Sequence, residues 1–457
     1  MKKRILCIIL GMFMLFAMVG TTGCNENGGG VNENENGSRD PAPGPPAATG
    51  DTRTITIGTW FDMYYTSQHD DVYDNPRVTD ILIAEMELEN MRAIEEHYDV
   101  RLEYVNLTWN GIQESITTSI MAGRPDVDVY LTDLQFGIPA VLSQLAISLE
   151  SMGLAGSDAF TDKIVMKSLN LGQDETFLFR SSLLSSISVY PMAFNMDMIL
   201  EHNLENPQDL WDRGEWTWDV WRQYLVTLTD PTRGIYGWSG YWTNMLHGLL
   251  HSNGTTIASG PTTTVNSSPT IDVFDLIYTI YNLERTARPW DDSTWEVNNN
   301  MYAQGLSGFW VTADWIMGEF GGGELPFEIG VVPWPIGNNG NKETNTHGPV
   351  GGNWYMIPRG VENPRLVYDV IFDWLNWYDY DRELAEDLEW SQNQFITERN
   401  FNYALMMELN TGFDIWESMN LGDGFSMLEI MNGETTASSY AESVRPLIQD
   451  ALDNFFG

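Results

Sequence analysis

Residues 175–200 have the sequence ETFLFRSSLLSSISVYPMAFNMDMIL, and this stretch decides how the chain is divided. Two short runs of apolar, β-branched and aromatic residues, 176–179 and 187–194, are typical of strands. Small serines separate the two runs, and a helix-like segment, 196–200, follows. We interpret the stretch as a strand that leaves one lobe, a thin connector, and a strand that begins a second lobe. Since ligands commonly bind in clefts between domains, this division favours an interlobe ligand site.

The N-terminus has the features of an export signal. Three basic residues precede the apolar run 5–19, which is short for a membrane-spanning helix. The residues Thr21-Thr22-Gly23-Cys24 just after this run resemble a bacterial lipobox, although Thr21 occupies the position where leucine is usual. The resemblance implies a signal peptide over 1–23 and a diacylglycerol-modified thiol at Cys24. A plain secretory signal is the alternative. Cys7 lies within the leader, so the mature chain would have no internal disulfide.

Composition excludes several classes of partner. The chain of 457 residues is 43% apolar and 12% aromatic, enough for two to three domains with sizeable cores. Its formal net charge of −41 would repel the phosphate backbone, so we expect no nucleic-acid binding. The same charge disfavours docking on anionic lipid head groups. We therefore expect contact with a membrane through the lipid anchor only, with the acidic surface keeping an exported protein in solution.

A polar segment separates the leader from the folded part. Residues 24–52 contain one aliphatic side chain larger than alanine, Val31, so they cannot bury a core and are expected to form a flexible tether. Strand and helix patterns then alternate, which favours an α/β fold with a parallel sheet. The expected strands are 54–58, 100–107 and 127–131, and the expected helices are 81–97 and 112–122, the second ending at Gly123.

The second half of the chain continues the mixed pattern. Helices are expected at 209–228, with Thr217 as an N-cap, and at 271–283, 363–377, 384–390, 400–407 and 440–456. Strands are expected at 309–315, 327–332 and 354–357. Asn195, at the end of the founding strand, is expected to bond the backbone rather than a ligand.

Several short motifs occur in an order that resembles one known family. They are IMAGRPDV (120–127), YPMAFN (190–195), the NP…GEWTW segment (206–218), GIYG (234–237), the segment 305–315, VVPWP (331–335) and GGNW (351–354). Together they resemble the extracellular solute-binding proteins of ABC importers, the group that includes maltose-binding protein, over roughly residues 53–457. After Gly305 the family usually has lysine-alanine-alanine-methionine, whereas this chain has leucine-serine-glycine-phenylalanine.

The resemblance implies a two-lobed, periplasmic-binding-protein-like α/β fold with three hinge crossings and a ligand cleft between the lobes. The crossings would lie near 182–187, 347–351 and 394–397. Lobe one would comprise 53–183 and 350–394, and lobe two 187–346 and 397–457. These boundaries follow from the family pattern laid onto this sequence.

The resemblance also implies a function. We expect a lipid-anchored receptor on the extracellular face of the bacterial cytoplasmic membrane, a monomer that binds a mono- or oligosaccharide and delivers it to ABC permease subunits. Sugars offer apolar C–H faces to aromatic rings and hydroxyls to carboxylates and amides. The alternatives are the same fold with a peptide, a polyamine or another small organic solute, or a non-transport surface protein that holds or degrades glycans.

The candidate ligand-binding residues are mostly aromatic residues near expected strand ends or crossings. Ligand sites of α/β sheets lie at the carboxyl ends of strands. The resemblance implies sugar stacking at Trp315 and in the region 238–242, which follows the Tyr-Gly turn. The candidates are Trp60, Asp133, Tyr190, Trp238, Tyr241, Trp242, Trp315 and Trp354. For each, packing or a solvated loop position is the alternative. Trp218, Trp221, Trp374 and Trp377 lie in helical patterns and are expected to pack.

No pattern points to catalysis. The six histidines have no HExxH spacing, and the sequence has no G-x-S-x-G motif. Carboxylate pairs such as Glu324 and Glu328 are expected by chance in a chain with 64 acidic residues, so they do not indicate a glycosidase. The acidic segment 70–80 lacks the glycine of an EF-hand loop. We therefore expect no catalytic residue, no metal and no cofactor.

Overall fold

The computed structural model describes residues 52–62, 72, 81–154, 175–180, 189–290, 301–319, 325–348, 353–375, 395–412, 414, 416–419, 421 and 424–456. The predicted leader, Cys24, nearly all of the tether, and the predicted helix 384–390 lie outside these ranges. Within them, no helix is both long and apolar enough to cross a membrane.

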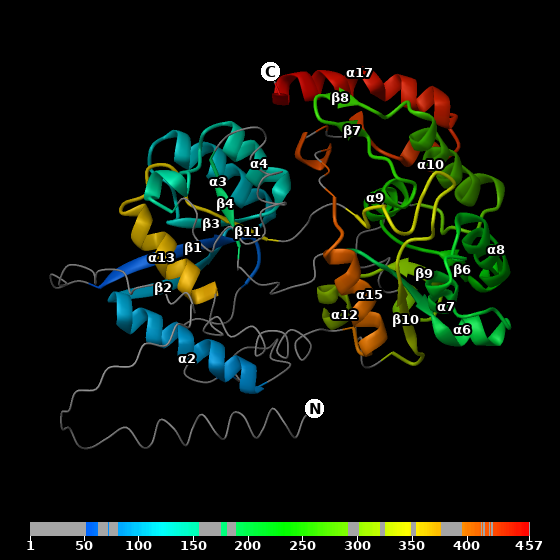
Figure 1. Ribbon diagram of the computed structural model, residues 1–457, viewed down its shortest axis with the longest axis horizontal. Coiled ribbons are helices and arrows are strands. Elements are labelled where there is room, and N and C mark those ends of the chain that lie inside the picture. The colour runs from blue at the N-terminus through cyan, green and yellow to red at the C-terminus, as the bar shows by residue number, and fades with distance from the viewer. Residues whose placement is uncertain are drawn as a thin grey trace, which may run out of the picture. The chain divides into compact units, whose positions relative to one another are not determined.

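The first sheet has five strands in the order β2-β1-β3-β11-β4 (Figure 1). Its strands are β1 (Arg53–Thr59), β2 (Val100–Asn106), β3 (Val129–Thr132), β4 (Leu178–Phe179) and β11 (Trp354–Met356). β1 pairs in parallel with β2 and β3, whereas β11 is antiparallel to β3 and β4. The parallel arrangement predicted for β1, β2 and β3 is therefore confirmed, and β11 alone runs against the direction of the other four strands. β11 joins this sheet only after the chain has built the second one, so no strand–helix–strand crossover fixes its direction.

Helices cover both faces of the first sheet. They are α2 (Ile81–Tyr98), α3 (Trp109–Met121), α4 (Leu134–Leu142) and α13 (Pro364–Leu375), with a short 3₁₀ turn, η2 (Glu150–Met152). All four residues of β3 are buried. Val129 and Leu131 share a core with α2 and α13, while Tyr130 packs in a separate core with α3 and α4. The unbroken apolar run of β3 follows from this two-sided cover.

The second sheet has four strands in the order β10-β5-β9-β6. They are β5 (Met192–Asn195), β6 (Tyr236–Trp238), β9 (Ser307–Val311) and β10 (Ile329–Val332). β5 is antiparallel to β9 and β10, and β6 is parallel to β9. The predicted strand 309–315 is wrong at its end, because β9 stops at Val311 and Trp315 belongs to α12 (Asp314–Glu319). Asp314 in the first turn favours a helix start there.

The remaining elements surround the second sheet, and most of them share one core with it. They are α6 (Met196–Glu201), α7 (Pro207–Asp212), α8 (Trp218–Leu228), η4 (Pro231–Arg233), α9 (Trp242–Ser252), the hairpin β7 (Ala258–Ser259) and β8 (Thr262–Thr263), α10 (Ser268–Tyr278), the π-helical turn η5 (Thr279–Leu283), α15 (Glu398–Glu408), η6 (Trp416–Met419), α16 (Leu428–Met431) and α17 (Ala437–Phe456).

Local signals account for several of these boundaries. The predicted helix 209–228 is two helices, α7 and α8, because Gly214 between them has a φ of 74°, which suits glycine. Thr217 is the N-cap of α8 as predicted, although its side chain makes no capping hydrogen bond. Asn195 caps α6 by accepting from the Met198 amide at 3.0 Å, which confirms its expected backbone role. Trp218 and Trp221 are buried, as expected of packing residues.

Candidate ligand-binding site

The first sheet gathers aromatic residues where its parallel strands end. β1 and β2 run in register, with Thr59 opposite Asn106, so both strands finish at the same edge as β3. Trp60 follows β1 directly, and Trp109 follows β2 after a two-residue turn. Phe136 lies in the first turn of α4, just after β3. Parallel strands therefore place three rings at one edge, which is the usual ligand side of an α/β sheet.

These rings contact one another. The ring of Trp60 lies 5.4 Å from that of Trp109 and 5.6 Å from that of Phe136, each edge to face, and Trp109 lies 5.3 Å from Phe136. Phe61 packs on Trp60 at 5.5 Å. We call these four residues the first aromatic cluster. Phe136 is buried, Trp60 and Phe61 are half-buried, and Trp109 is 39% exposed. The cluster thus offers solvent one supported indole, which is suitable for stacking on a ligand.

Trp109 is a residue that the sequence reasoning missed. The signal was available, because Trp109 follows the second expected strand much as Trp60 follows the first. The backbone just before Trp109 is unusual, because Thr108, the N-cap of α3, has φ 64° and ψ 164°. This conformation is essentially restricted to glycine and costs of order 1–3 kcal/mol in other residues, and such strain clusters at functional sites. The Thr108 amide donates to Asn106 Oδ1 at 2.9 Å, which holds the turn.

Polar groups line the same edge. Asn106 Nδ2 donates to Asp62 Oδ1 at 2.9 Å, and this pair is exposed. Asp133, predicted as a hydroxyl acceptor, caps α4 by accepting from the Gln135 amide at 2.8 Å. One carboxylate oxygen of Asp133 is therefore engaged in capping α4. The carboxylates and the amide still provide the acceptors and donors that a polyol needs beside an aromatic face.

The second sheet has a corresponding edge. Because β6 and β9 are parallel and β5 is antiparallel to both neighbours, the ends of β6 and β9 meet the start of β5. Tyr241 and Trp242 follow β6, Trp315 follows β9, and Tyr190 precedes β5. Four predicted site residues are thus brought to one edge by strand topology.

The side chains at this edge differ in exposure. Trp242 stacks on Trp416 of η6 with ring centroids 6.4 Å apart, and Tyr241 lies edge to face with Trp290 at 5.5 Å. Both predicted residues are half-buried, whereas Trp315 on α12 is 47% exposed. We call Tyr190, Tyr241, Trp242, Trp315 and their contacts Trp290 and Trp416 the second aromatic cluster.

Two predicted tryptophans have no open ring face in the structure. Trp238 lies in β6 with no exposed surface and packs between Trp221 and Trp334. Trp354 lies in β11, between β3 and β4, and is also fully buried. The guanidinium of Arg180 lies over the Trp354 ring, 4.5 Å from its centroid, so it covers one face of the indole. Neither residue enters the proposal below.

Segment η6 contacts a helix that packs on the first sheet and a helix that packs on the second. Ser418 Oγ donates to the carbonyl of Leu134, at the start of α4, over 3.0 Å. Trp416, two residues earlier, stacks on Trp242. The same short segment therefore touches the strand-end region of the first sheet and the second aromatic cluster.

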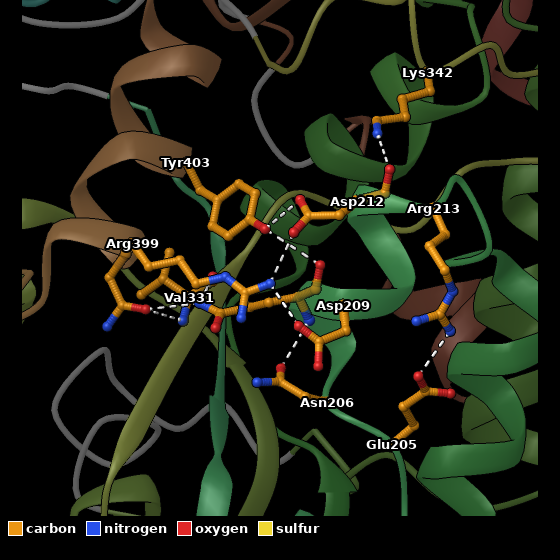
Figure 2. Close-up of polar contacts among 11 residues, drawn as sticks. Glu205, Asn206, Asp209, Asp212, Arg213, Val331, Lys342, Arg399 and Tyr403 are labelled. Carbon is orange, nitrogen blue, oxygen red and sulfur yellow. Dashed lines mark hydrogen bonds and ion pairs between the residues drawn. The ribbon is translucent and has the colours of Figure 1, made fainter.

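A separate cavity of about 740 Å³ lies beside α7 and α15. Figure 2 shows its polar contacts: Arg399 bonds Asp209 at 2.7 Å and Asp212 at 2.8 Å, and the Tyr403 hydroxyl donates to Asp212 at 2.6 Å. Lys342 Nζ donates to the Asp212 carbonyl at 3.0 Å. None of the predicted ligand-binding residues lines this cavity.

The charged side chains of this network bond one another within the protein. Burial works against the charged form of Arg399, but its hydrogen bonds to Asp209, Tyr403 and Asp212 raise its pKa above the ordinary value. Burial and the bond to Asp212 raise the pKa of Tyr403 to about 12. The guanidinium stays cationic and the phenol neutral at physiological pH, so the network joins α7 to α15. We assign this network a structural role and place the candidate ligand site at the aromatic clusters.

Comparisons with known proteins agree with this fold. A family model described as bacterial extracellular solute-binding protein matches residues 75–378. No curated protein sequence matches the chain. Among solved structures, an ABC substrate-binding protein from Listeria monocytogenes in complex with cycloalternan is 13% identical, with a TM-score of 0.63 over 89% of this chain and 98% of that one.

Two further structures are similar to the same extent. The GacH receptor of Streptomyces glaucescens, studied with acarbose, is 14% identical, with a TM-score of 0.62 over 88% of this chain and 99% of that chain. UgpB from Mycobacterium tuberculosis, in complex with glycerophosphocholine, is 14% identical, with a TM-score of 0.63 over 88% and 99%. At these identities the likeness concerns the fold, which is the two-lobed fold of periplasmic binding proteins.

Proposed function

The chain belongs to the bacterial extracellular solute-binding protein family, and from this premise we propose that it is the receptor of an ABC importer for a carbohydrate. The observation that carries the proposal is the presence of an aromatic cluster at a strand-end edge of each sheet. Each cluster includes one indole with open surface, Trp109 at 39% and Trp315 at 47%. A pyranose ring can stack on each indole while its hydroxyls bond Asp62, Asn106 or Asp133.

Binding and delivery follow from the fold. A solute that contacts both lobes stabilises their closed arrangement, because it gains more contacts there than in the open one. We propose that residues of the first aromatic cluster and Tyr190, Tyr241, Trp242 and Trp315 supply these contacts. The closed receptor would then dock on the permease subunits as a monomer.

Attachment to the membrane is the second part of the proposal. The motif at Cys24 supports lipidation, and the polar segment 25–51 would let the folded part stand away from the bilayer. The protein would work on the extracellular face of the cytoplasmic membrane.

The class of carbohydrate is suggested by the similar structures. Cycloalternan and acarbose are the ligands named for two of them, so oligosaccharides are the first class to test. The structure with glycerophosphocholine favours a second candidate, a small organic solute with a cationic head group. Aromatic faces attract such cations, and the acidic surface would not repel them.

A thermal-shift panel tests the proposal. Linear and cyclic oligosaccharides, acarbose, glycerophosphocholine, a polyamine and a mixed peptide are each added to the purified chain. A bound solute stabilises the folded state by about 2.7 kcal/mol at 100 times its dissociation constant, which raises Tm by a few degrees for a chain of this size. We expect a shift with at least one oligosaccharide and none with the peptide.

The opposite pattern would change the assignment. A shift with glycerophosphocholine or polyamine alone would move the protein to the second candidate. Oligosaccharide shifts that persist in a Trp109→Ala, Trp315→Ala double variant would place the site elsewhere on the molecule.

A further inference from the structure

Helix α9 carries two histidines on one face, and the ring of His247 packs against Trp416 of the second aromatic cluster. His247 and His251 are four residues apart, so one helical turn brings their rings together, and both are buried. Asp414, on the segment that follows α15, reaches the same point. One ligand atom from each of these three side chains lies within 4.8 Å of the other two.

The distances around Asp414 suit a shared ion better than hydrogen bonds. Asp414 Oδ2 is 3.9 Å from His247 Nδ1 and 3.8 Å from His251 Nε2, and the Asp414 side chain has no exposed surface. Both distances exceed the range of a hydrogen bond. Two ligands that each lie about 2.1 Å from a tetrahedral zinc ion are separated by about 3.4 Å. The observed gaps therefore need only a small contraction.

The surroundings orient His251 as a ligand would be oriented. Its Nδ1 lies 2.6 Å from Thr346 Oγ1, so Nε2 faces Asp414, and within the described residues Nε2 has no hydrogen-bond partner. Backbone bonds from His347 to Asn410 and from Gly412 to Gly348 fix the two segments that carry Thr346 and Asp414. Metal-binding histidines characteristically bond a second group through the other ring nitrogen.

The three side chains also match the ligand types that zinc takes in proteins. A carboxylate with two neutral imidazoles is the ligand set of many zinc centres that keep a fourth position open.

We propose that His247, His251 and Asp414 form a binding site for a divalent transition-metal ion, with zinc as the best match to its imidazole and carboxylate ligands. The ion would join α9 to the segment that continues into Trp416. Since Trp416 stacks on Trp242, a metal at this position would be coupled to the second aromatic cluster through Trp416. The existence of the site does not depend on which solute binds.

The site has a built-in spectroscopic reporter. Trp416 Nε1 donates to His247 Nδ1 at 3.2 Å. Coordination through that nitrogen would take its lone pair and displace the indole N–H. Metal binding should therefore change the emission of Trp416.

The test uses the purified full chain, freed of metal with a chelator and then incubated with zinc and passed through gel filtration. We expect about one zinc per chain by elemental analysis, and His251→Gln and Asp414→Asn should lose it. Thr346→Val should bind about 10- to 100-fold more weakly, because it removes only the partner of His251. His202→Gln, at the exposed C-cap of α6, is the matched control and should keep the metal.

Cobalt provides a second measurement that needs no variant. Cobalt in the unaltered chain should give the visible absorption of a tetrahedral or five-coordinate site and change tryptophan emission in parallel. A chain that retains no zinc and gives only the spectrum of hydrated cobalt would overturn the proposal. Equal zinc retention by folded His251→Gln and Asp414→Asn would do the same, because the ion would then sit elsewhere.

Discussion

Trp315 is the residue at which stacking on a ligand can be separated from packing in the core. Its side chain is 47% exposed on α12, so truncation leaves no sealed cavity. We expect Trp315→Ala to lower the affinity for the bound sugar about 5- to 150-fold, which corresponds to about 1–3 kcal/mol. The free energy of unfolding should change by less than about 1 kcal/mol.

Trp238→Ala is the matched comparison. Trp238 is fully buried, so its truncation should lower the free energy of unfolding by about 3–5 kcal/mol. Calorimetric titration and denaturant unfolding measure both quantities. Unchanged affinity together with a marked loss of stability in Trp315→Ala would remove Trp315 from the site.

Single residues also mark the limit of sequence-based prediction here. The pattern correctly placed Trp60, Tyr241, Trp242 and Trp315 near strand ends, because strand topology alone decides that. It could not decide which way a ring turns. Trp354 was expected to begin a strand and to line the ligand site, yet in β11 its ring is fully buried with Arg180 over its face. That outcome depends on long-range packing, which spacing along the chain does not encode.

At the scale of elements, α15 is held to the second sheet through one buried amide. Asn400 Oδ1 accepts from Gln208 Nε2 and from the Val331 amide, both at 2.9 Å (Figure 2 labels Val331). Its Nδ2 donates to the carbonyls of Ile329 and Phe395, both at 3.1 Å. The side chain is 2% exposed. Both acceptor lone pairs and both donor N–H groups of this amide are therefore satisfied.

We expect Asn400→Ala to lower the free energy of unfolding by about 3 kcal/mol or more, because it leaves several buried donors and acceptors without a partner. Denaturant unfolding followed by circular dichroism measures this change. Asn402→Ala, an exposed position on the same helix, is the control and should stay within about 0.5 kcal/mol. A similar small effect for both variants would mean that α15 is held by apolar packing alone.

The elements themselves were predictable to different degrees. Periodicity located β1, β2, α2, α3 and α15, since each has a regular pattern and local end signals. Periodicity could not give the direction of β11, whose partners β3 and β4 lie far from it in sequence. It also extended β9 through Trp315, because a short apolar run does not distinguish a strand end from the first turn of a helix.

At the scale of the whole molecule, the proposed anchoring depends on one side chain. We expect Cys24→Ala to abolish lipidation, because its thiol is the proposed acceptor for diacylglycerol. The variant should be released to the medium or remain as an uncut precursor. Detergent-phase partitioning and the mass of the mature protein measure the outcome. Partitioning that equals that of the unaltered protein would contradict the anchor, and Cys7→Ala controls for the other cysteine.

The order of short motifs predicted the family and the two-lobed fold, because order survives when individual motifs diverge. It did not predict that η6 would bond the start of α4 through Ser418, or that Asp414 would meet the two histidines of α9. These contacts join residues that lie far apart in the sequence.

The strained backbone at Thr108 implies that this molecule is not tuned for maximum heat tolerance. A glycine there would relieve the left-handed conformation and would cap α3 nearly as well. Thr108→Gly is therefore a suitable first substitution for raising the thermal stability of this protein. The same exchange would make the turn before Trp109 more flexible. A gain in folding stability at position 108 would therefore come with a loss of affinity for the proposed solute.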